Sequence, residues 1–352
     1  MLSVLSSTRR NLLVIATIGI VVQCSISTAV AQKNDIEIQL AFPLRMDGRI
    51  CEQLEELWKD GKLTCSREKM LEQIEHPVHQ RFELPAPSTE PRSGAEIYKI
   101  ARESHVRLGH GVRNDATGKW VFNGGAGYVI APGGIVATCC HCLETPPVPA
   151  DPAFPDRERT SWLFAVTMDG KVYPATSVLA ANDELDAAIV QVEGLPNRPI
   201  ALNEDVTPGD TAYLFSEPFG VRGYFSNGII NRFYWLKDPA DPQTLAGAAR
   251  YRINIGTDWA PGSSGAAVID TYGNVIGHVS RISALQPNSG EEPSRPDSAK
   301  ADENQKPTPR ESRGPQGNVT FMVLHEAIPA RGVRLLAEKA LEPPSEEEQQ
   351  PE

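Results

Sequence analysis

The sequence predicts a mainly β protein whose central part folds into two small antiparallel barrels. Between Glu103 and Arg281, short segments rich in β-branched and aromatic residues alternate with Gly, Pro, Asn and Asp, which is the pattern of strands joined by turns. This span is long enough for two small barrels. Helical spacing is confined to the stretches on either side of it, so we expect helices only at the two ends of the domain.

The chain begins with a pattern typical of a secretory signal peptide, residues 1–31. Arg9 and Arg10 precede an apolar run that ends at Cys24, and small residues precede the expected cleavage site after Ala31. The run is shorter than the ~20 residues that a membrane-spanning helix needs, so we expect no stable membrane insertion after cleavage. The stretch TRRNLL also resembles a twin-arginine export signal, and both export routes stay open. We expect a secreted or periplasmic protein.

Charge and composition mark two further segments. The chain of 352 residues has a net charge of -11, which argues against nucleic acid as a partner. Residues 284–317 are rich in proline and charge, and residues 342–352 form an acidic tail. Such segments bury too little apolar surface to offset the entropy of ordering, so we expect a disordered insertion and a disordered tail.

Residues 32–93 predict a helical N-terminal appendage that ends in a Pro-rich linker. Helical spacing is interrupted at Gly61, and Cys51 and Cys65 flank this turn. In an exported protein we expect these two cysteines to form a disulfide, which by closing a loop of ~15 residues contributes about 3 kcal/mol. Residues 94–341 then form the main domain, from a short helix before the strands to a closing helix in LHEAIPARGVRLLAEKAL.

Three side chains in the main domain have the types needed for nucleophilic catalysis. His141 follows an apolar run in GGIVATCCHCLE, Asp186 begins the apolar segment DAAIVQV, and Ser264 lies in the Gly-rich turn PGSSGAAVID. A hydroxyl nucleophile needs a base, and the base needs an acid to fix its tautomer and stabilise its charged form. Small neighbours of the serine let backbone N–H groups approach a substrate carbonyl.

In these motifs the chain resembles the trypsin-like serine proteases of the chymotrypsin fold, nearest to the bacterial glutamyl-endopeptidase-like and high-temperature-requirement branches. GAGYVIAPGGIVATCCHCLE resembles the family's segment that carries the base, LDAAIVQV its aspartate strand and PGSSGAAVID its nucleophile loop. The order His, Asp, Ser is also that of the family. The resemblance implies two six-stranded antiparallel β-barrels with N-terminal helices and a C-terminal helix.

The resemblance also implies a role for each residue of the motifs. His141, Asp186 and Ser264 would form the catalytic triad, and the backbone N–H groups of Gly262 and Ser264 the oxyanion hole. The rivals are Asp183 and Glu184 for the acid, since both lie in the same turn, and Ser263 for the nucleophile. The position of Asp186 directly before the apolar strand and the G-x-S-G register favour the first choices.

A substrate pocket lined by Asp258, His278 and Ser280 is a further implication of the resemblance. Asp258 lies six residues before Ser264, where trypsin has the carboxylate that attracts Arg or Lys. An aspartate that caps a turn is the alternative for Asp258. A histidine packed inside its strand is the alternative for His278.

The cysteines around His141 raise the question of a metal site, and the sequence disfavours one. Adjacent side chains at the end of a strand point in diverging directions, so we expect neither a zinc site nor any cofactor. One or both of Cys139 and Cys140 are expected to be buried core residues. Cys142 stands where many relatives carry a disulfide cysteine, but FNGGAGY lacks the usual partner.

Together these features predict an exported serine endopeptidase that hydrolyses peptide bonds in a polypeptide substrate. The alternative is a catalytically inactive binding module that keeps the two barrels.

Overall fold

The structure is a computed structural model that describes residues 46–114, 117–144, 161–285 and 322–341. The predicted signal peptide and acidic tail lie outside these residues, as does the predicted insertion except for its first two residues. None of the described helices is both long enough and apolar enough to span a membrane.

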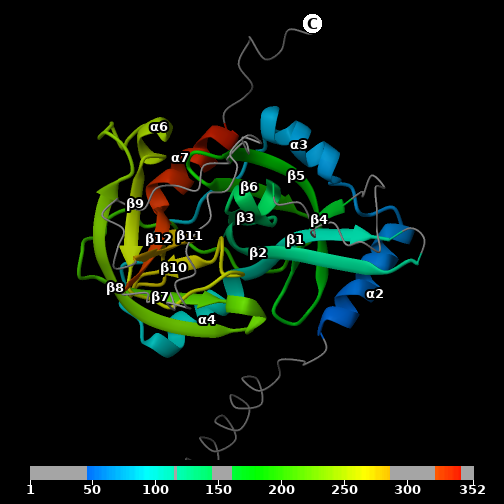
Figure 1. The fold of residues 1–352 in the computed structure, drawn as a ribbon, viewed down its shortest axis with the longest axis horizontal. Coiled ribbons are helices and arrows are strands. Elements are labelled where there is room, and N and C mark those ends of the chain that lie inside the picture. The colour runs from blue at the N-terminus through cyan, green and yellow to red at the C-terminus, as the bar shows by residue number, and fades with distance from the viewer. Residues whose placement is uncertain (1–45, 115–116, 145–160, 286–321, 342–352) are drawn as a thin grey trace, which may run out of the picture. The chain divides into compact units, whose positions relative to one another are not determined.

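Six antiparallel strands close the first barrel in the order β1-β2-β3-β6-β5-β4 (Figure 1). They are β1 (His105–Arg113), β2 (Trp120–Ala131), β3 (Ile135–Thr138), β4 (Ser161–Val166), β5 (Val172–Asn182) and β6 (Ala187–Val192). Val106, Leu108 and Val190 are among the aliphatic side chains that fill the interior. The tight turn between β2 and β3 requires glycine at Gly134, because its φ is +81° and a Cβ atom there would lie 2.0 Å from the carbonyl oxygen of Val192.

Six further antiparallel strands close the second barrel in the order β10-β11-β12-β9-β8-β7. They are β7 (Thr211–Ser216), β8 (Tyr224–Trp235), β9 (Tyr251–Ile255), β10 (Ala267–Ile269), β11 (Val275–Leu285) and β12 (Met322–Pro329). Leu214, Ile253 and Val268 lie in its core. The predicted fold class, two six-stranded barrels of the chymotrypsin type, is confirmed.

The longer helices lie at the two ends of the domain, and short helical segments lie between the strands. They are α2 (Met46–Lys59), α3 (Arg67–Glu75), α4 (Gly94–Ser104) and α7 (Ala330–Leu341), with the short segments α5 (His141–Glu144), α6 (Leu245–Ala248) and the 3-10 turn η1 (Pro218–Gly220). The helix α4 begins at a capping box in which Ser93 and Glu96 bond each other's backbone N–H groups. Met70 of α3 is buried in the core of the first barrel, so the N-terminal helices are packed onto that barrel.

The predicted disulfide between Cys51 and Cys65 is not present, and this prediction is corrected. Both residues carry thiols. The Sγ atom of Cys51 faces the carbonyl oxygen of Trp120 at 3.7 Å, whereas Cys65 is buried in the core of the first barrel. The helix α2 therefore directs Cys51 toward β2. Burial raises the pKa of the Cys65 thiol to about 11, which keeps it protonated.

A carboxylate attaches α2 to the first barrel. Glu55 accepts hydrogen bonds from Nε of Arg113 at 2.8 Å and from Nε1 of Trp120 at 2.9 Å. The Arg113 guanidinium also lies 3.8 Å from the ring centroid of Trp58. The hydrogen bonds from Arg113 and Trp120 lower the pKa of Glu55 from 4.5 to about 2.

We expect the attachment of α2 to depend on pH through Glu55. Because its pKa is lower in the folded protein, the stabilisation is complete above pH 4.5 and is lost as the pH falls toward about 2. Hydrogen exchange of the α2 amides measures this loss. Glu55→Gln should remove the pH dependence, and the neighbouring Glu56→Gln should keep it. An unchanged profile in Glu55→Gln would contradict the assignment.

Candidate active site

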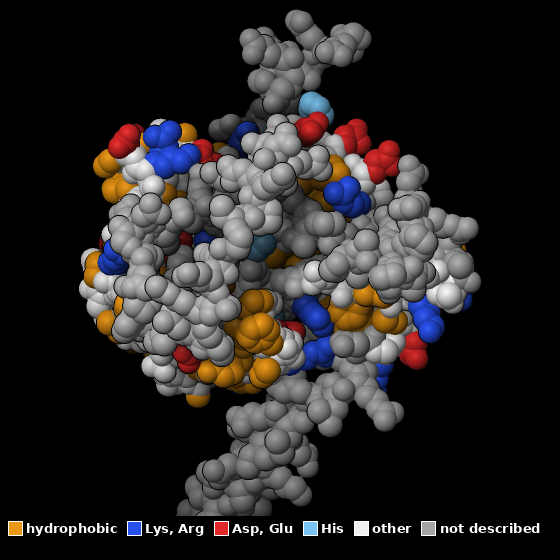
Figure 2. All heavy atoms as spheres, in the orientation of Figure 1, with side chains coloured by type: hydrophobic (Ala, Val, Ile, Leu, Met, Phe, Trp, Pro, Cys, Tyr) orange, Lys and Arg blue, Asp and Glu red, His pale blue; other side chains and the backbone are white. Residues whose placement is uncertain are grey.

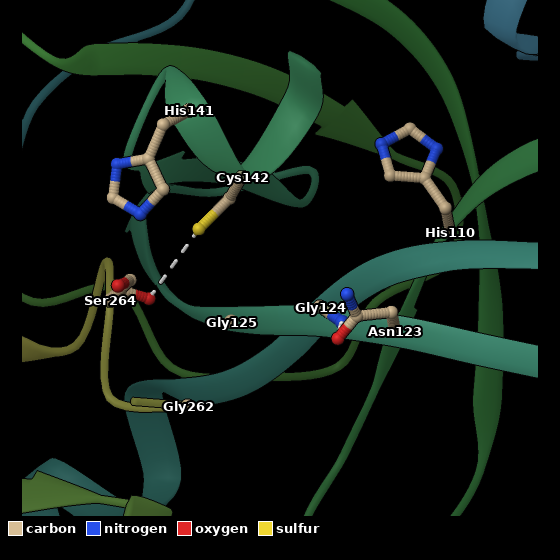
Figure 3. Close-up of a pocket in the computed structure, with 8 residues that line it drawn as sticks. All are labelled: His110, Asn123, Gly124, Gly125, His141, Cys142, Gly262 and Ser264. Carbon is tan, nitrogen blue, oxygen red and sulfur yellow. Dashed lines mark hydrogen bonds between the residues drawn. The ribbon is translucent and has the colours of Figure 1, made fainter. Parts of the chain in front are cut away.

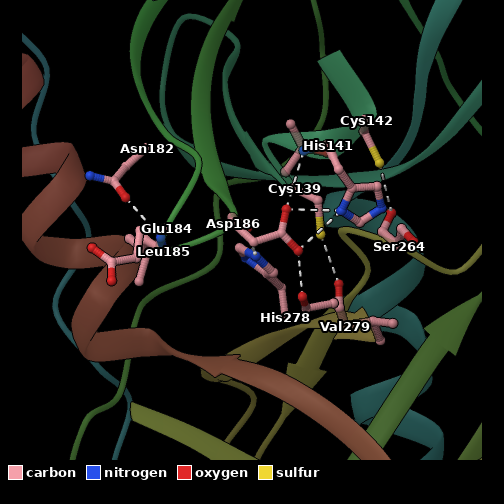
Figure 4. A network of polar contacts seen from close by, with 12 residues as sticks. Cys139, His141, Cys142, Asn182, Glu184, Leu185, Asp186, Ser264, His278 and Val279 are labelled. Atoms are coloured by element: carbon pink, nitrogen blue, oxygen red, sulfur yellow. Dashed lines mark hydrogen bonds and ion pairs between the residues drawn. The ribbon is translucent and has the colours of Figure 1, made fainter. Parts of the chain in front are cut away.

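His141 lies at the junction of the two barrels, at the first position of α5 and directly after β3 (Figure 4). Its Nδ1 atom is 2.8 Å from Oδ1 of Asp186 and 3.0 Å from Oδ2. Its backbone N–H also donates to Oδ1 of Asp186, at 3.2 Å. The side chain is 44% exposed, so the other face of the ring is open to a substrate. The fold therefore brings His141 and Asp186 together, as the sequence predicted.

Asp186 occupies the turn between β5 and β6 in a left-handed conformation, with φ at +61°. Aspartate tolerates this conformation better than most residues, and the turn is closed by its N–H bond to the carbonyl of Asp183 at 3.0 Å. Two side chains of β11 in the second barrel contact Asp186. The hydroxyl of Ser280 donates to Oδ2, and Nε2 of His278 lies 3.1 Å from the Asp186 carbonyl oxygen.

Asp183 and Glu184, the rivals of Asp186, are both exposed. Glu184 forms an ion pair with Lys237 at 2.8 Å. Only Asp186 of these three is buried and hydrogen-bonded to the His141 ring.

Opposing effects set the pKa of the acid and of the base. Burial acts to raise the pKa of Asp186, but the hydrogen bonds from His141 and Ser280 outweigh it and lower the pKa. Burial acts to lower the pKa of His141, and its contacts with Asp186 and with the Cys142 thiol raise it to about 10. Asp186 is therefore an anion that favours a proton on the ring of His141.

The thiol of Cys142 shares a proton with this system. A hydrogen bond with Cys139 lowers the pKa of Cys142, burial raises it, and the contact with His141 lowers it again, to about 6. Burial holds the pKa of Cys139 well above its usual range. A proton on His141 and a thiolate at Cys142 therefore favour each other. Only the form with a protonated Cys142 leaves His141 free to act as a base.

The loop that carries Ser264 is held by both barrels. The carbonyl oxygen of Ser264 accepts from the N–H of Ala126 on β2 at 2.7 Å, and the N–H of Gly265 donates to Val279 on β11 at 2.8 Å. Gly265 has φ at +83°, and a Cβ atom there would lie 2.2 Å from the carbonyl oxygen of Ala126. The neighbouring Ser263 is fully buried and bonded to the hydroxyl of Ser216 at 3.1 Å, which leaves Ser264 as the serine of the pocket.

Two backbone N–H groups beside Ser264 have no hydrogen-bond acceptor among the described residues. They belong to Gly262 and to Ser264 itself, the two positions predicted for the oxyanion hole. Gly262 has φ at +100°, and a Cβ atom there would lie 2.7 Å from the carbonyl oxygen of Glu217. Only glycine therefore fits this turn, and its backbone N–H remains available to a substrate oxygen.

A pocket of about 90 Å³ lies against the loop (Figure 3). Its lining residues are His110, Asn123, Gly124, Gly125, His141, Cys142, Gly262 and Ser264. In the space-filling view a histidine side chain is visible in a hollow of the surface (Figure 2). The base, the nucleophile candidate and the N–H groups therefore face one small space.

None of the three residues predicted for the substrate pocket lines the described pocket beside Ser264. Asp258 is exposed and accepts from the hydroxyl of Tyr224 at 3.1 Å, so it is not a buried carboxylate at the base of a pocket. His278 is fully buried, which lowers its pKa to about 4. His278 and Ser280 contact Asp186 and are absent from the lining of the pocket. The position of His278 and Ser280 in a strand does not show, from the sequence alone, whether they contact the substrate or Asp186.

The expectation that the cysteines diverge is wrong for two of them. Ligand atoms of Cys139, His141 and Cys142 all lie within 4.8 Å of one another. Cys140 is buried outside this group, as predicted for a core residue. The signal that sequence reasoning missed is the C-x₂-C spacing of Cys139 and Cys142, which the short helix α5 turns into a convergent pair.

The two closed barrels, with His141, Asp186 and Ser264 at their junction, define a chymotrypsin-like fold of the serine peptidase class. Residues 125–277 match the sequence model of the trypsin-like peptidase domain. The matched region contains His141, Asp186 and Ser264, in agreement with the resemblance that the motifs predicted.

Known proteins with similarity to the chain include a serine protease and an HtrA-type protease. Serine protease PepD of Mycobacterium tuberculosis is 30% identical over 129 residues, which are 35% of this chain and 27% of PepD. The solved structure of an HtrA-type protease, AlgW with a decapeptide, aligns at 17% identity and a TM-score of 0.46, over 70% of this chain and 67% of the AlgW chain. The chain thus matches about a quarter of the length of its curated relative.

Asp186→Asn should lower the rate of peptide or ester hydrolysis on the order of 10⁴-fold, because an amide stabilises the wrong tautomer of His141. Asparagine tolerates the left-handed backbone, so the turn should stay intact. Asp183→Asn, in the same turn, is the control and should keep its rate. Equal rates in both variants would contradict the role of Asp186. The measurement is kcat/KM on a chromogenic substrate.

Proposed function

We propose that the protein is an exported serine endopeptidase that uses His141, Asp186 and Ser264 as a catalytic triad. The observation that carries the proposal is the hydrogen bond of 2.8 Å between His141 and a buried Asp186, beside a pocket that also holds Ser264. The trypsin-like peptidase domain and the similarity to a serine protease support the same activity. The expected substrate is a polypeptide, and the chemistry requires no cofactor.

The proposed reaction begins when Oγ of Ser264 attacks the carbonyl carbon of the scissile bond. His141 takes the hydroxyl proton, and the carboxylate of Asp186 stabilises the imidazolium that forms. The N–H groups of Gly262 and Ser264 donate to the oxyanion of the tetrahedral intermediate. His141 then gives its proton to the leaving amine, which leaves an acyl-enzyme on Ser264. A water molecule, deprotonated by His141, repeats these steps and releases the acid.

Export is part of the proposal because of the leader pattern at residues 1–31. We expect the mature protein to begin at Gln32 when it is produced in a bacterial host with an active export system. N-terminal sequencing of the periplasmic or secreted fraction tests this expectation. Recovery of the intact N-terminus from the membrane fraction would contradict cleavage after Ala31.

Ser264→Ala should abolish hydrolysis, with a loss on the order of 10⁴-fold or more, and should abolish labelling by a fluorophosphonate probe. The matched control is Ser263→Ala, which removes the adjacent hydroxyl and should keep the labelling. Mass spectrometry of the labelled wild-type protein should find the probe on Ser264.

A folded wild-type protein that the probe does not label would favour the alternative, an inactive binding module that keeps the two barrels. Labelling of Ser264→Ala at the wild-type rate would contradict the assignment of the nucleophile.

A further inference from the structure

Three potential metal ligands surround one point beside the proposed base. The sulfur atoms of Cys139 and Cys142 and a ring nitrogen of His141 all lie within 4.8 Å of one another. In a tetrahedral zinc site with Zn–S near 2.3 Å and Zn–N near 2.0 Å, neighbouring donors are separated by about 3.5 Å. Small side-chain movements would therefore bring all three donors to a common ion.

We propose that Cys139, His141 and Cys142 form a binding site for a thiophilic divalent metal ion such as Zn²⁺, and that the bound ion blocks His141 from acting as a base. The binding site stands on geometry alone, whereas its inhibitory effect rests on the proposed peptidase function.

The surroundings of His141 suit a metal ligand. Asp186 bonds Nδ1, so Nε2 is the ring nitrogen whose lone pair would bind an ion when the ring is neutral. Histidines that bind metals commonly donate their other N–H to a carboxylate in this way, which fixes the ring and raises its basicity. The same nitrogen would accept the proton of Ser264 during catalysis. Metal binding and catalysis would therefore exclude each other.

Charge balance also favours a divalent ion. Two cysteine thiols would release two protons on binding, and the resulting pair of thiolates neutralises an ion of charge +2. This balance matters because Cys139 is fully buried, where an unpaired thiolate would be costly. In the present arrangement the Cys139 thiol donates to the Val279 carbonyl at 3.0 Å, a bond that it would exchange for the metal.

The fourth position of a tetrahedral ion would be left to solvent or substrate. Cys142 and His141 both line the pocket that contains Ser264, and Sγ of Cys142 lies 3.8 Å from the Ser264 carbonyl oxygen (Figure 3). Opposite Cys142 stands Gly125, where a Cβ atom would lie 2.7 Å from the sulfur. With glycine at this position no side chain of residue 125 crowds the sulfur of Cys142.

The binding experiment uses the full mature chain, reduced with a phosphine, freed of metal and titrated with Co²⁺. It is carried out in the Ser264→Ala background, so that binding is measured whether or not the protein is a peptidase. We expect one Co²⁺ per chain and a thiolate-to-cobalt charge-transfer band in the near ultraviolet. Added Zn²⁺ should displace the cobalt and remove the band.

Cysteine variants test the ligands one at a time. Cys139→Ala and Cys142→Ala should each weaken Co²⁺ binding at least ~10-fold, and the control Cys140→Ala should bind as the parent does. Cys139→Ser keeps a donor for Val279 and shows whether a loss in Cys139→Ala reflects damage to the fold. The proposal is overturned if the parent shows no charge-transfer band, or if the three alanine variants bind Co²⁺ equally.

The inhibition experiment uses the chain with Ser264 intact. Zn²⁺ should inhibit the wild type and Cys140→Ala at equal concentrations, and Cys139→Ala should require at least ~10-fold more Zn²⁺. Equal inhibition of all three would overturn the proposed mechanism of inhibition. A wild type that binds Co²⁺ through the thiolates but hydrolyses no substrate would contradict the peptidase function and support the metal site.

Discussion

The buried carboxylate of Asp186 is the constraint on which the arrangement of the site depends. A carboxylate taken out of water costs several kcal/mol unless hydrogen bonds replace its hydration. Here the donors come from both barrels: the backbone and ring of His141 from the first, and the hydroxyl of Ser280 from the second. His278 adds a contact to the Asp186 backbone. The way the two barrels pack against each other therefore determines the orientation of the proposed base.

The nucleophile loop depends on the same junction through backbone contacts. Ser264 bonds β2 of the first barrel through its carbonyl, and Gly265 bonds β11 of the second. The N–H groups of Gly262 and Ser264 have no acceptor among the described residues. The proposed oxyanion hole would work because its donors are fixed before the charge develops. The contacts that hold the loop between the two barrels therefore also position the donors that would stabilise the oxyanion.

The sequence predicted the two barrels and the residues at their junction because those signals are local. Alternating apolar runs define strands, and the G-x-S-G register distinguishes Ser264 from Ser263 within four residues. Most of the wrong predictions depended on distant contacts, whereas the convergence of Cys139 and Cys142 had a local signal in their C-x₂-C spacing. Whether Asp258 is buried depends on the approach of β8, and the partner of Cys51 depends on how α2 lies on β2. The role of Ser280 depends on the position of β11 beside Asp186, which the sequence alone does not give.

The cysteines beside His141 show how a residue distant in the sequence affects the chemistry of a site. The resemblance to the trypsin-like proteases implies a disulfide at the position of Cys142, which would consume its sulfur. In this chain Gly125 lies opposite Cys142 and offers no partner, while Cys139 comes within ligand distance from the same strand end. Asp186 raises the basicity of His141 toward a proton and toward a metal ion alike. The feature that makes His141 a strong base therefore also makes it a ligand, and the reduced sulfurs beside it supply the rest of a metal site.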